Sequence, residues 1–134
     1  MDPIIRVLVV DDSQCWQVYI LKRFETESDL KIVAVASEGL EAVQKASDLK
    51  PDVILMDLGL PGINGLEAAR RIRAISPDSR VLFLSEHDSH EFVVAAFEAG
   101  ACAYILKSDA ATDLMPGIRA LLESREYVSR SLRH

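Results

Sequence analysis

The chain has 134 residues and a formal net charge of −6 at pH 7, with 49% hydrophobic and 27% charged residues. This length and composition fit one globular domain with a real core. The negative charge argues against nucleic-acid binding by this chain itself, because phosphate contacts need clustered Lys and Arg. No apolar run approaches the ~20 residues of a transmembrane helix, and MDPIIRVLVV does not resemble a signal peptide, so we expect a cytoplasmic protein without membrane contact.

Neither the cysteines nor the densest basic stretch indicates a site. Cys15 and Cys102 form no CxxC motif and have no histidine at metal-ligand spacing, so we expect two reduced, packed thiols. The stretch RRIR at residues 70–73 alternates with apolar residues at helical spacing, and is interpreted as a solvated helix face.

Strand-like and helix-like segments alternate along the whole chain. Short apolar runs bounded by turn residues indicate strands, and apolar residues spaced three or four apart indicate helices. In chain order the elements are a strand at 4–10, a helix at 13–27, a strand at 32–36, a helix around 40–46, a strand at 52–56, a helix around 66–72, a strand at 81–84, a helix around 92–97, a strand at 104–106 and a helix around 118–122.

Five repeats of strand then helix predict an α/β fold with a five-stranded parallel sheet and helices on both faces. Right-handed crossovers place the carboxyl ends of all five strands at one edge, where open α/β sheets bind their ligands. No linker or second domain is visible. The closing stretch SREYVSRSLRH is polar, and we expect it to be loosely ordered.

The stretch DVILMDLGLP ends an unbroken apolar run on a bare carboxylate, Asp57, with Gly59 and Pro61 close behind. Such a run suits a strand buried on both faces. Taken alone, Asp57 is a common turn initiator at the end of a strand. Its position at the carboxyl edge also makes it a candidate site residue.

Other polar residues are predicted at the same edge. The first strand ends in Asp11-Asp12, the fourth in Ser85 and the fifth in Lys107. Three close carboxylates repel one another, and a hard divalent cation such as Mg²⁺ resolves that repulsion. One carboxylate could then attack a phosphoryl group, with the metal and Lys107 offsetting the charge on the phosphoryl oxygens and Ser85 donating a hydrogen bond.

Each of these residues also has a simpler explanation. Asp12 or Ser13 can N-cap the first helix. Lys107 alone would be a solvated lysine, Ser85 a strand terminus and Tyr104 a half-buried strand aromatic. The joint pattern at one edge favours a functional site over these separate explanations.

Four segments, VLVVDDS, VILMDLGLPGINGLE, VLFLSEHD and AGACAYILK, resemble the signature segments of two-component response-regulator receiver domains. The resemblance runs from about residue 5 to about residue 122, and implies a flavodoxin-like (βα)5 receiver domain over residues 1–124. It implies a phosphorylation-activated signalling switch that phosphorylates and dephosphorylates itself, and is not a turnover enzyme. The phosphoryl donor would be a sensor histidine kinase or a small molecule such as acetyl phosphate.

The same resemblance assigns roles to the edge residues. Asp57 would be the phosphoacceptor, and Asp11 or Asp12 would hold Mg²⁺, with Mn²⁺ as a substitute, together with Asp57 and the backbone carbonyl of Gly59. Lys107 would bind the phosphoryl group. Two further residues are similar to the switch pair of the family, Ser85 as the hydroxyl and Tyr104 as the aromatic.

Two longer stretches, SEHDSHEFVVAAFEAGACAYILKSD and ALLESREYVSRSL, resemble receivers of the NarL/FixJ (LuxR-type) subfamily, which carry a C-terminal helix-turn-helix domain. This implies control of transcription, with DNA bound only through an output domain that this chain lacks, and a phosphorylation-dependent homodimer. Residues 125–134 would be a tail or the start of the linker to that domain. A stand-alone single-domain receiver is the alternative.

The sequence departs from the family pattern at four places. Ser108 replaces a frequent proline after the lysine, so we expect a trans bond there. Pro116 would be costly inside a helix, so we expect the last helix to begin near Asp113. We expect Glu86, beside the site, to point outward. Trp16 belongs to an unusual first turn, near where kinases usually dock.

Two other functional classes compete with the receiver. A Mg²⁺-dependent phosphatase of the haloacid dehalogenase type also uses an aspartyl phosphate, but its nucleophile lies in a DxD-like motif on the first strand, whereas Asp11 and Asp12 are adjacent. A flavodoxin-like cofactor binder would need a glycine-rich phosphate loop, which DDSQCW does not supply. A degenerate, phosphorylation-independent receiver is a further alternative.

Overall fold

The computed structural model describes residues 3–133, and strands and helices alternate through them. The elements are β1 (Ile5–Val10), α1 (Gln14–Phe24), β2 (Leu30–Ala36), α2 (Gly39–Leu49), β3 (Val53–Met56), α3 (Gly65–Ile75), β4 (Arg80–Ser85), α4 (His90–Glu98), β5 (Ala103–Leu106), α5 (Ala110–Leu122) and β6 (Tyr127–Val128), with 3₁₀ turns η1 (Lys107–Asp109) and η2 (Arg130–Leu132). The predicted alternation of strands and helices is confirmed, with one additional short strand.

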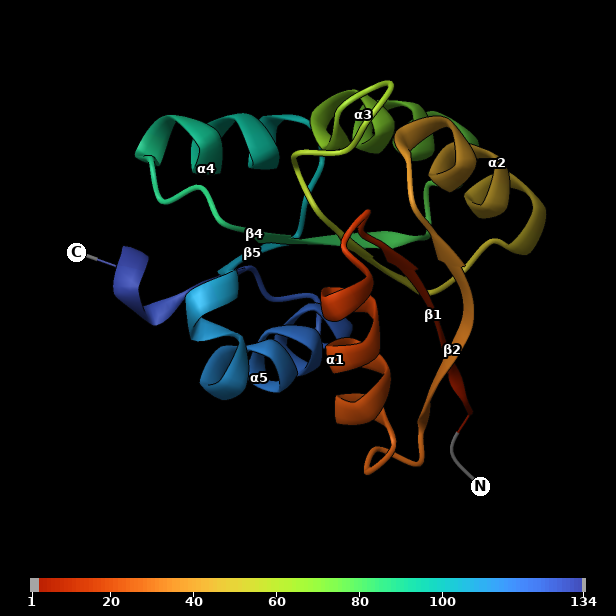
Figure 1. The fold of residues 1–134 in the computed structure, drawn as a ribbon, viewed down its shortest axis with the longest axis horizontal. Coiled ribbons are helices and arrows are strands. Elements are labelled where there is room, and N and C mark those ends of the chain that lie inside the picture. Colours follow the sequence, from red (N-terminus) through yellow and green to blue (C-terminus); the bar gives the residue numbers. More distant parts are fainter. Residues whose placement is uncertain (1–2, 134) are drawn as a thin grey trace.

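All strand pairs are parallel, and the order across the sheet is β2-β1-β3-β4-β5-β6. Helices α2, α3 and α4 cover one face of the sheet, and α1 and α5 cover the other (Figure 1). This is the predicted three-layer, flavodoxin-like arrangement. Because the strands are parallel, their carboxyl ends meet at one edge.

Side chains alternate between the two faces along each central strand. On β3, Val53 and Leu55 pack against α1 and α5, whereas Ile54 and Met56 pack against the α2–α4 layer. All four are at most 1% exposed, which explains why the strand reads as an unbroken apolar run. Continuing the alternation past Met56 assigns Asp57 to the α1/α5 side of the edge.

The described part of the polar tail, residues 124–133, is ordered, and the expectation of a loose tail is wrong for these residues. The backbone of β6 extends the sheet, with the Tyr127 N–H donating to the carbonyl of Cys102 at 3.3 Å and the Ser129 N–H to that of Tyr104 at 2.9 Å. The Ser129 side chain is fully buried, accepts from the Leu106 N–H at 3.1 Å and donates to Asp109 at 2.6 Å. The tail's serines serve as hydrogen-bond partners, a role that polarity alone does not reveal.

Helix α5 also differs from expectation, because it begins at Ala110 and contains Pro116 in its interior. A proline there costs about 3 kcal/mol through its missing N–H and its ring. Leu114, Ile118 and Leu121, spaced four and three residues apart, are buried to 1% exposure or less. Burying each contributes about 1.5–3 kcal/mol, which outweighs the proline and fixes the helix in this register.

Smaller expectations have mixed outcomes. The described residues contain no cis peptide bond, which confirms a trans bond between Lys107 and Ser108. Both cysteines are free, as expected, but Cys15 is exposed rather than packed. Among the described residues, no helix has the length and apolar character needed to cross a bilayer.

Gly65, the first residue of α3, leaves no room for a side chain. A Cβ at this position would overlap the backbone oxygen of Asp57 and lie 2.9 Å from the Cα of Leu58. Backbone atoms cannot rotate away, so we predict that Gly65→Ala lowers the free energy of unfolding by about 2 kcal/mol and Tm by roughly 5–10 °C in thermal denaturation. In the matched variant Gly59→Ala, the Cβ meets nothing within 4 Å. Its Tm should stay near that of the parent, and equal losses in the two variants would contradict the steric explanation.

Ser129 offers a second test, of the tail. Ser129→Ala removes the buried acceptor of the Leu106 N–H and one hydrogen-bond donor to Asp109. We predict a loss of about 1–3 kcal/mol in the free energy of unfolding, and faster amide exchange at Leu106. The control is Ser131→Ala, whose exposed hydroxyl also bonds Asp109 and should matter much less. Unchanged exchange at Leu106 in Ser129→Ala would contradict the tail packing described here.

Candidate functional site

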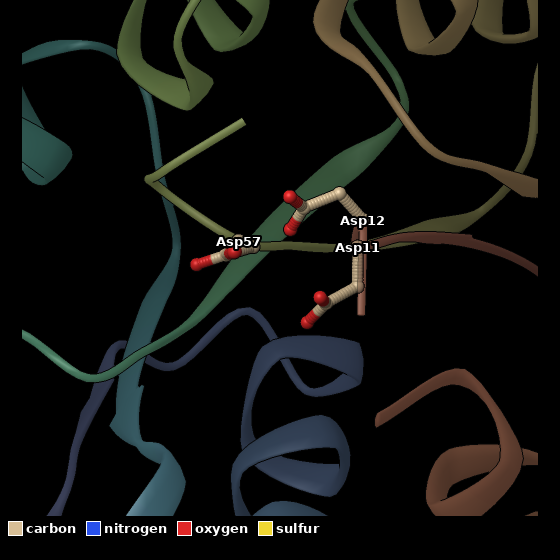
Figure 2. A group of neighbouring side chains, drawn as sticks. All are labelled: Asp11, Asp12 and Asp57. Atoms are coloured by element: carbon tan, nitrogen blue, oxygen red, sulfur yellow. The ribbon is translucent and has the colours of Figure 1, made fainter. Parts of the chain in front are cut away.

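Three carboxylates gather where β1 and β3 end. Asp11, Asp12 and Asp57 each offer an oxygen, and these oxygens lie within 4.8 Å of one another (Figure 2). The exposed fraction of the side chains differs, because Asp11 is buried, Asp57 is partly exposed and Asp12 is exposed. The parallel packing of β1 against β3, with Val10 opposite Met56, brings these positions together.

Lys107 supplies the positive charge of the cluster. Its Nζ lies 2.9 Å from Oδ2 of Asp11 and 3.7 Å from Oδ2 of Asp57, and its side chain is only 7% exposed. It follows β5 directly as the first residue of η1. The three aspartates and this lysine, which were predicted to share one edge of the sheet, lie together in the structure.

Burial makes the ionised form of the Asp11 carboxyl group less favourable. Desolvation raises its pKa above the ordinary value of 3.8, against the lowering effects of the Ser13 backbone N–H, which donates to it at 2.9 Å, and of Lys107. Asp57 also raises this pKa, because its negative charge lies close by. The Lys107 ammonium therefore does not fully offset the cost of burying the ionised carboxyl group of Asp11.

A cleft of about 360 Å³ opens above the cluster. Its lining combines acidic, basic and aromatic side chains with the backbone of the β3–α3 loop: Asp12, Ser13, Cys15, Trp16, Asp57, Gly59, Glu86, His87 and Lys107. Glu86 is exposed and is one of the residues that line the cleft. Ser13 caps α1 by accepting from the Trp16 N–H at 3.4 Å, so Asp12 is not the cap and remains free to face the cleft.

Ser85 and Tyr104 lie on the other side of the edge, against the loop between β4 and α4. The Ser85 hydroxyl accepts from the His87 N–H at 3.0 Å, and the Tyr104 hydroxyl donates to the His87 carbonyl at 2.7 Å. Both side chains are fully buried, which does not fit the simpler explanation of Tyr104 as a half-buried strand aromatic. Burial also raises the pKa of Tyr104. Both polar atoms of the His87 peptide backbone are thus held by the two residues expected to act as a switch.

Sequence reasoning did not assign Trp16 to the site. Its ring lies over the Lys107 ammonium, with Nζ 5.0 Å from the ring centroid, and it lines the cleft. The only sequence signal was an aromatic residue in the first turn after Asp11-Asp12. Whether that ring faces the end of β5 depends on the rotation of α1 about its own axis. The spacing of apolar residues in this helix does not specify that rotation.

The donor set fits a hard divalent cation. Carboxylate oxygens from Asp11, Asp12 and Asp57 are what Mg²⁺ prefers, and Mg²⁺ commonly keeps several waters in addition to one or two carboxylates. The exposed Gly59 lines the cleft and its N–H donates to Oδ1 of Asp57 at 3.3 Å, so its carbonyl is a further candidate ligand. Three carboxylates and one ammonium give the cluster an excess of acidic groups, which favours the binding of a cation.

An acidic cluster and a lysine at the carboxyl edge of a parallel, doubly covered sheet define a receiver domain. The family model described as "Response regulator receiver domain" matches residues 7–119, and the chain belongs to this family. This assignment decides against the phosphatase and the flavodoxin-like cofactor binder as families for the chain. Receiver domains of response regulators are signalling domains.

Among its relatives, the chain is 36% identical over 125 residues to the response regulator GacA of Pseudomonas viridiflava, covering 93% of the chain and 58% of that protein. It is 38% identical over 115 residues to VraR of Staphylococcus aureus, covering 86% and 55%. A solved LuxR-family response regulator from Aurantimonas sp. SI85-9A1 superposes with a TM-score of 0.91 at 33% identity, covering 96% and 92%. The resemblance to LuxR-type regulators is confirmed, and the chain spans a little over half the length of these curated relatives.

The electrostatics of Asp11 predict how Mg²⁺ changes stability with pH. Because the pKa of Asp11 is raised in the folded state, the folded chain binds more protons here than the unfolded chain, and this group's contribution to stability falls as pH rises above 3.8. Mg²⁺ competes with those protons. We predict that millimolar Mg²⁺ raises Tm, and that the rise is larger at about pH 8 than at about pH 5.

Thermal denaturation with and without Mg²⁺ at both pH values measures this effect. Asp11→Asn should reduce the pH dependence of the Mg²⁺-induced rise. Asp78→Asn, an exposed control that precedes β4, should retain it. An identical rise at both pH values in the parent would contradict the predicted competition.

Proposed function

We propose that this domain is a phosphorylation-controlled switch in which Asp57 accepts a phosphoryl group. The observation that carries the proposal is the pairing of Lys107 with Asp11 and Asp57 beside a cleft that the Asp57 side chain lines. Asp57 is partly exposed, so a donor can reach its carboxylate, while Lys107 and Asp11 are buried and held in place. Asp57 would thus be the accessible, reactive carboxylate, and Lys107 and Asp11 would provide fixed charges around it.

In the proposed reaction, a carboxylate oxygen of Asp57 attacks the phosphorus of a phosphohistidine on a sensor kinase or of acetyl phosphate. The new Oδ–P bond forms as the P–N or P–O bond to the donor breaks, and the donor leaves with the bonding electron pair. Lys107 offsets the negative charge on the phosphoryl oxygens. Mg²⁺, or Mn²⁺ in its place, would be held by Asp11, Asp12, Asp57 and the Gly59 carbonyl, and would supply further charge neutralisation.

The contacts of His87 support a route from the phosphoryl group to the α4 surface. The Ser85 hydroxyl can donate to a phosphoryl oxygen on Asp57, and a rotation of the serine oxygen toward Asp57 lengthens the bond that it accepts from the His87 N–H. Releasing the His87 N–H loosens the loop before α4, and the Tyr104 hydroxyl follows through its bond to the His87 carbonyl. Because Tyr104 is already inside, the proposed change is a rearrangement of this loop around the ring, not an inward swing of the ring into an empty space.

The partners of the whole protein are part of the proposal. The chain covers 55–58% of the curated relatives, and its last described residues follow β6. We infer a cytoplasmic regulator in which residues 125–134 lead to a helix-turn-helix output domain that binds DNA, with a homodimer formed on phosphorylation. A sensor histidine kinase is the proposed donor. The receiver itself remains a regulatory domain and not a turnover enzyme.

Intact-mass measurement after incubation with Mg²⁺ and acetyl phosphate tests the proposed chemistry. We predict one added phosphoryl group per chain, because a single carboxylate combines exposure with the lysine and metal-binding neighbours. The gain should vanish in Asp57→Asn and in the presence of a chelator, and persist in the exposed control Asp78→Asn. No gain in the parent, under conditions that phosphorylate another receiver, would contradict the proposal and support a phosphorylation-independent receiver.

A further inference from the structure

Trp16 makes a contact that the proposed phosphoryl transfer does not yet use. Its ring is partly buried, lines the cleft and lies over the Lys107 ammonium, with Nζ 5.0 Å from the ring centroid. Trp16 is the only tryptophan in the chain. The contact joins the first turn of α1 to the residue that follows β5.

The Lys107 ammonium has three N–H donors, and three neighbouring groups surround it. Asp11 accepts at 2.9 Å, and the face of Trp16 offers the negative potential of its π system. Asp57 lies at 3.7 Å, which is beyond hydrogen-bond distance. With the ammonium held by Asp11 and Trp16, its third donor is available on the side of Asp57.

Trp16 is itself supported by neighbours on its own helix. The ring packs edge-on against Tyr19, with centroids 5.2 Å apart and planes at 76°. Arg23 donates to the Tyr19 hydroxyl at 2.9 Å and to the carbonyl of Ala110, the first residue of α5, at 3.3 Å. Arg23 thus holds Tyr19, and Tyr19 in turn restrains the Trp16 ring whose face meets Lys107.

We propose that Trp16 is a positioning residue for the phosphoryl-binding site, and that the face of its ring holds the Lys107 ammonium ready for an anion on Asp57. The inference rests on the proposed function and extends it to a residue outside the acidic cluster. A long, flexible lysine loses rotamer entropy when it binds an anion, and a ring that restrains it beforehand reduces that loss. A cation–π contact at a partly desolvated site corresponds to about a five- to tenfold factor in an equilibrium constant.

Fluorination of the indole ring tests this role with little change in shape. Because the chain has one tryptophan, biosynthetic incorporation of mono-, di- and trifluorotryptophan labels Trp16 alone. Each fluorine withdraws electron density from the ring face and weakens its attraction for an ammonium. The measured quantity is the affinity for beryllofluoride in the presence of Mg²⁺, titrated by calorimetry.

We expect the affinity to fall stepwise with fluorination, to about fivefold below the parent for the trifluorinated ring. Trp16→Leu should lose a similar factor, and Trp16→Phe, which keeps an aromatic face, should recover part of it. The control Val18→Ala changes an exposed side chain of the same helix and should bind as the parent does. The fluorine resonance of monofluorinated Trp16 should also move in Lys107→Met, as a readout that needs no ligand.

The outcomes separate this inference from the proposed function. Beryllofluoride binding whose affinity does not vary across the fluorinated series would overturn the role of Trp16 and leave the proposed function standing. An unlabelled parent that does not bind beryllofluoride with Mg²⁺ would overturn both. An unmoved fluorine resonance in Lys107→Met would show that the ring and the ammonium are not in contact, and would also overturn the inference.

Discussion

The ion pair between Lys107 and Asp11 is the interaction on which the rest of the site depends. Both side chains are nearly inaccessible, at 7% and 2% exposure, and lie 2.9 Å apart. Removing Lys107 would leave the buried carboxylate of Asp11 without its opposite charge, at a cost of about 3–5 kcal/mol. The pair also fixes the charge balance, because one ammonium faces three carboxylates and leaves a net negative site that favours a divalent cation.

The same lysine connects the site to the end of the chain. It follows β5, in which the carbonyl of Tyr104 accepts from the Ser129 N–H and the N–H of Leu106 donates to the Ser129 hydroxyl. A displacement at the carboxyl end of β5 must therefore either break these bonds or move the tail with it. In the proposed regulator, the tail leads to the output domain, so its attachment to β5 offers a mechanical link between the two.

Much of the fold and the site followed from periodicity and one topological rule. The apolar run before Asp57 predicted a strand buried on both faces, and parallel strands with right-handed crossovers placed Asp11, Asp57 and Lys107 at a common edge. Leu55 and Ile105 pack on the same face of the sheet. Because side chains alternate along a strand, Asp57 and Lys107, two residues further on, are assigned to that same side. These contacts are determined by strand order and register, which the sequence pattern specifies well.

The features that escaped prediction depend on pairings between distant segments. Tyr104 is fully buried because its hydroxyl finds the carbonyl of His87, 17 residues away. Ser129 is buried, and its hydroxyl accepts from the Leu106 N–H and donates to Asp109. The sequence of a polar tail does not distinguish this serine from Ser131. The position of Trp16 over Lys107 likewise depends on the rotation of one helix.

The central claim is that Asp57, and not one of its neighbours, accepts the phosphoryl group. Since three carboxylates lie within 4.8 Å, a mass gain alone does not identify the acceptor. Treating the phosphorylated protein with borohydride reduces the acyl phosphate to the alcohol, which converts the phosphorylated aspartate to homoserine and marks it permanently. Peptide mapping by mass spectrometry should then find homoserine at position 57 and aspartate at positions 11 and 12. Homoserine at position 11 or 12, or a phosphorylated chain without any homoserine, would contradict the assignment of Asp57.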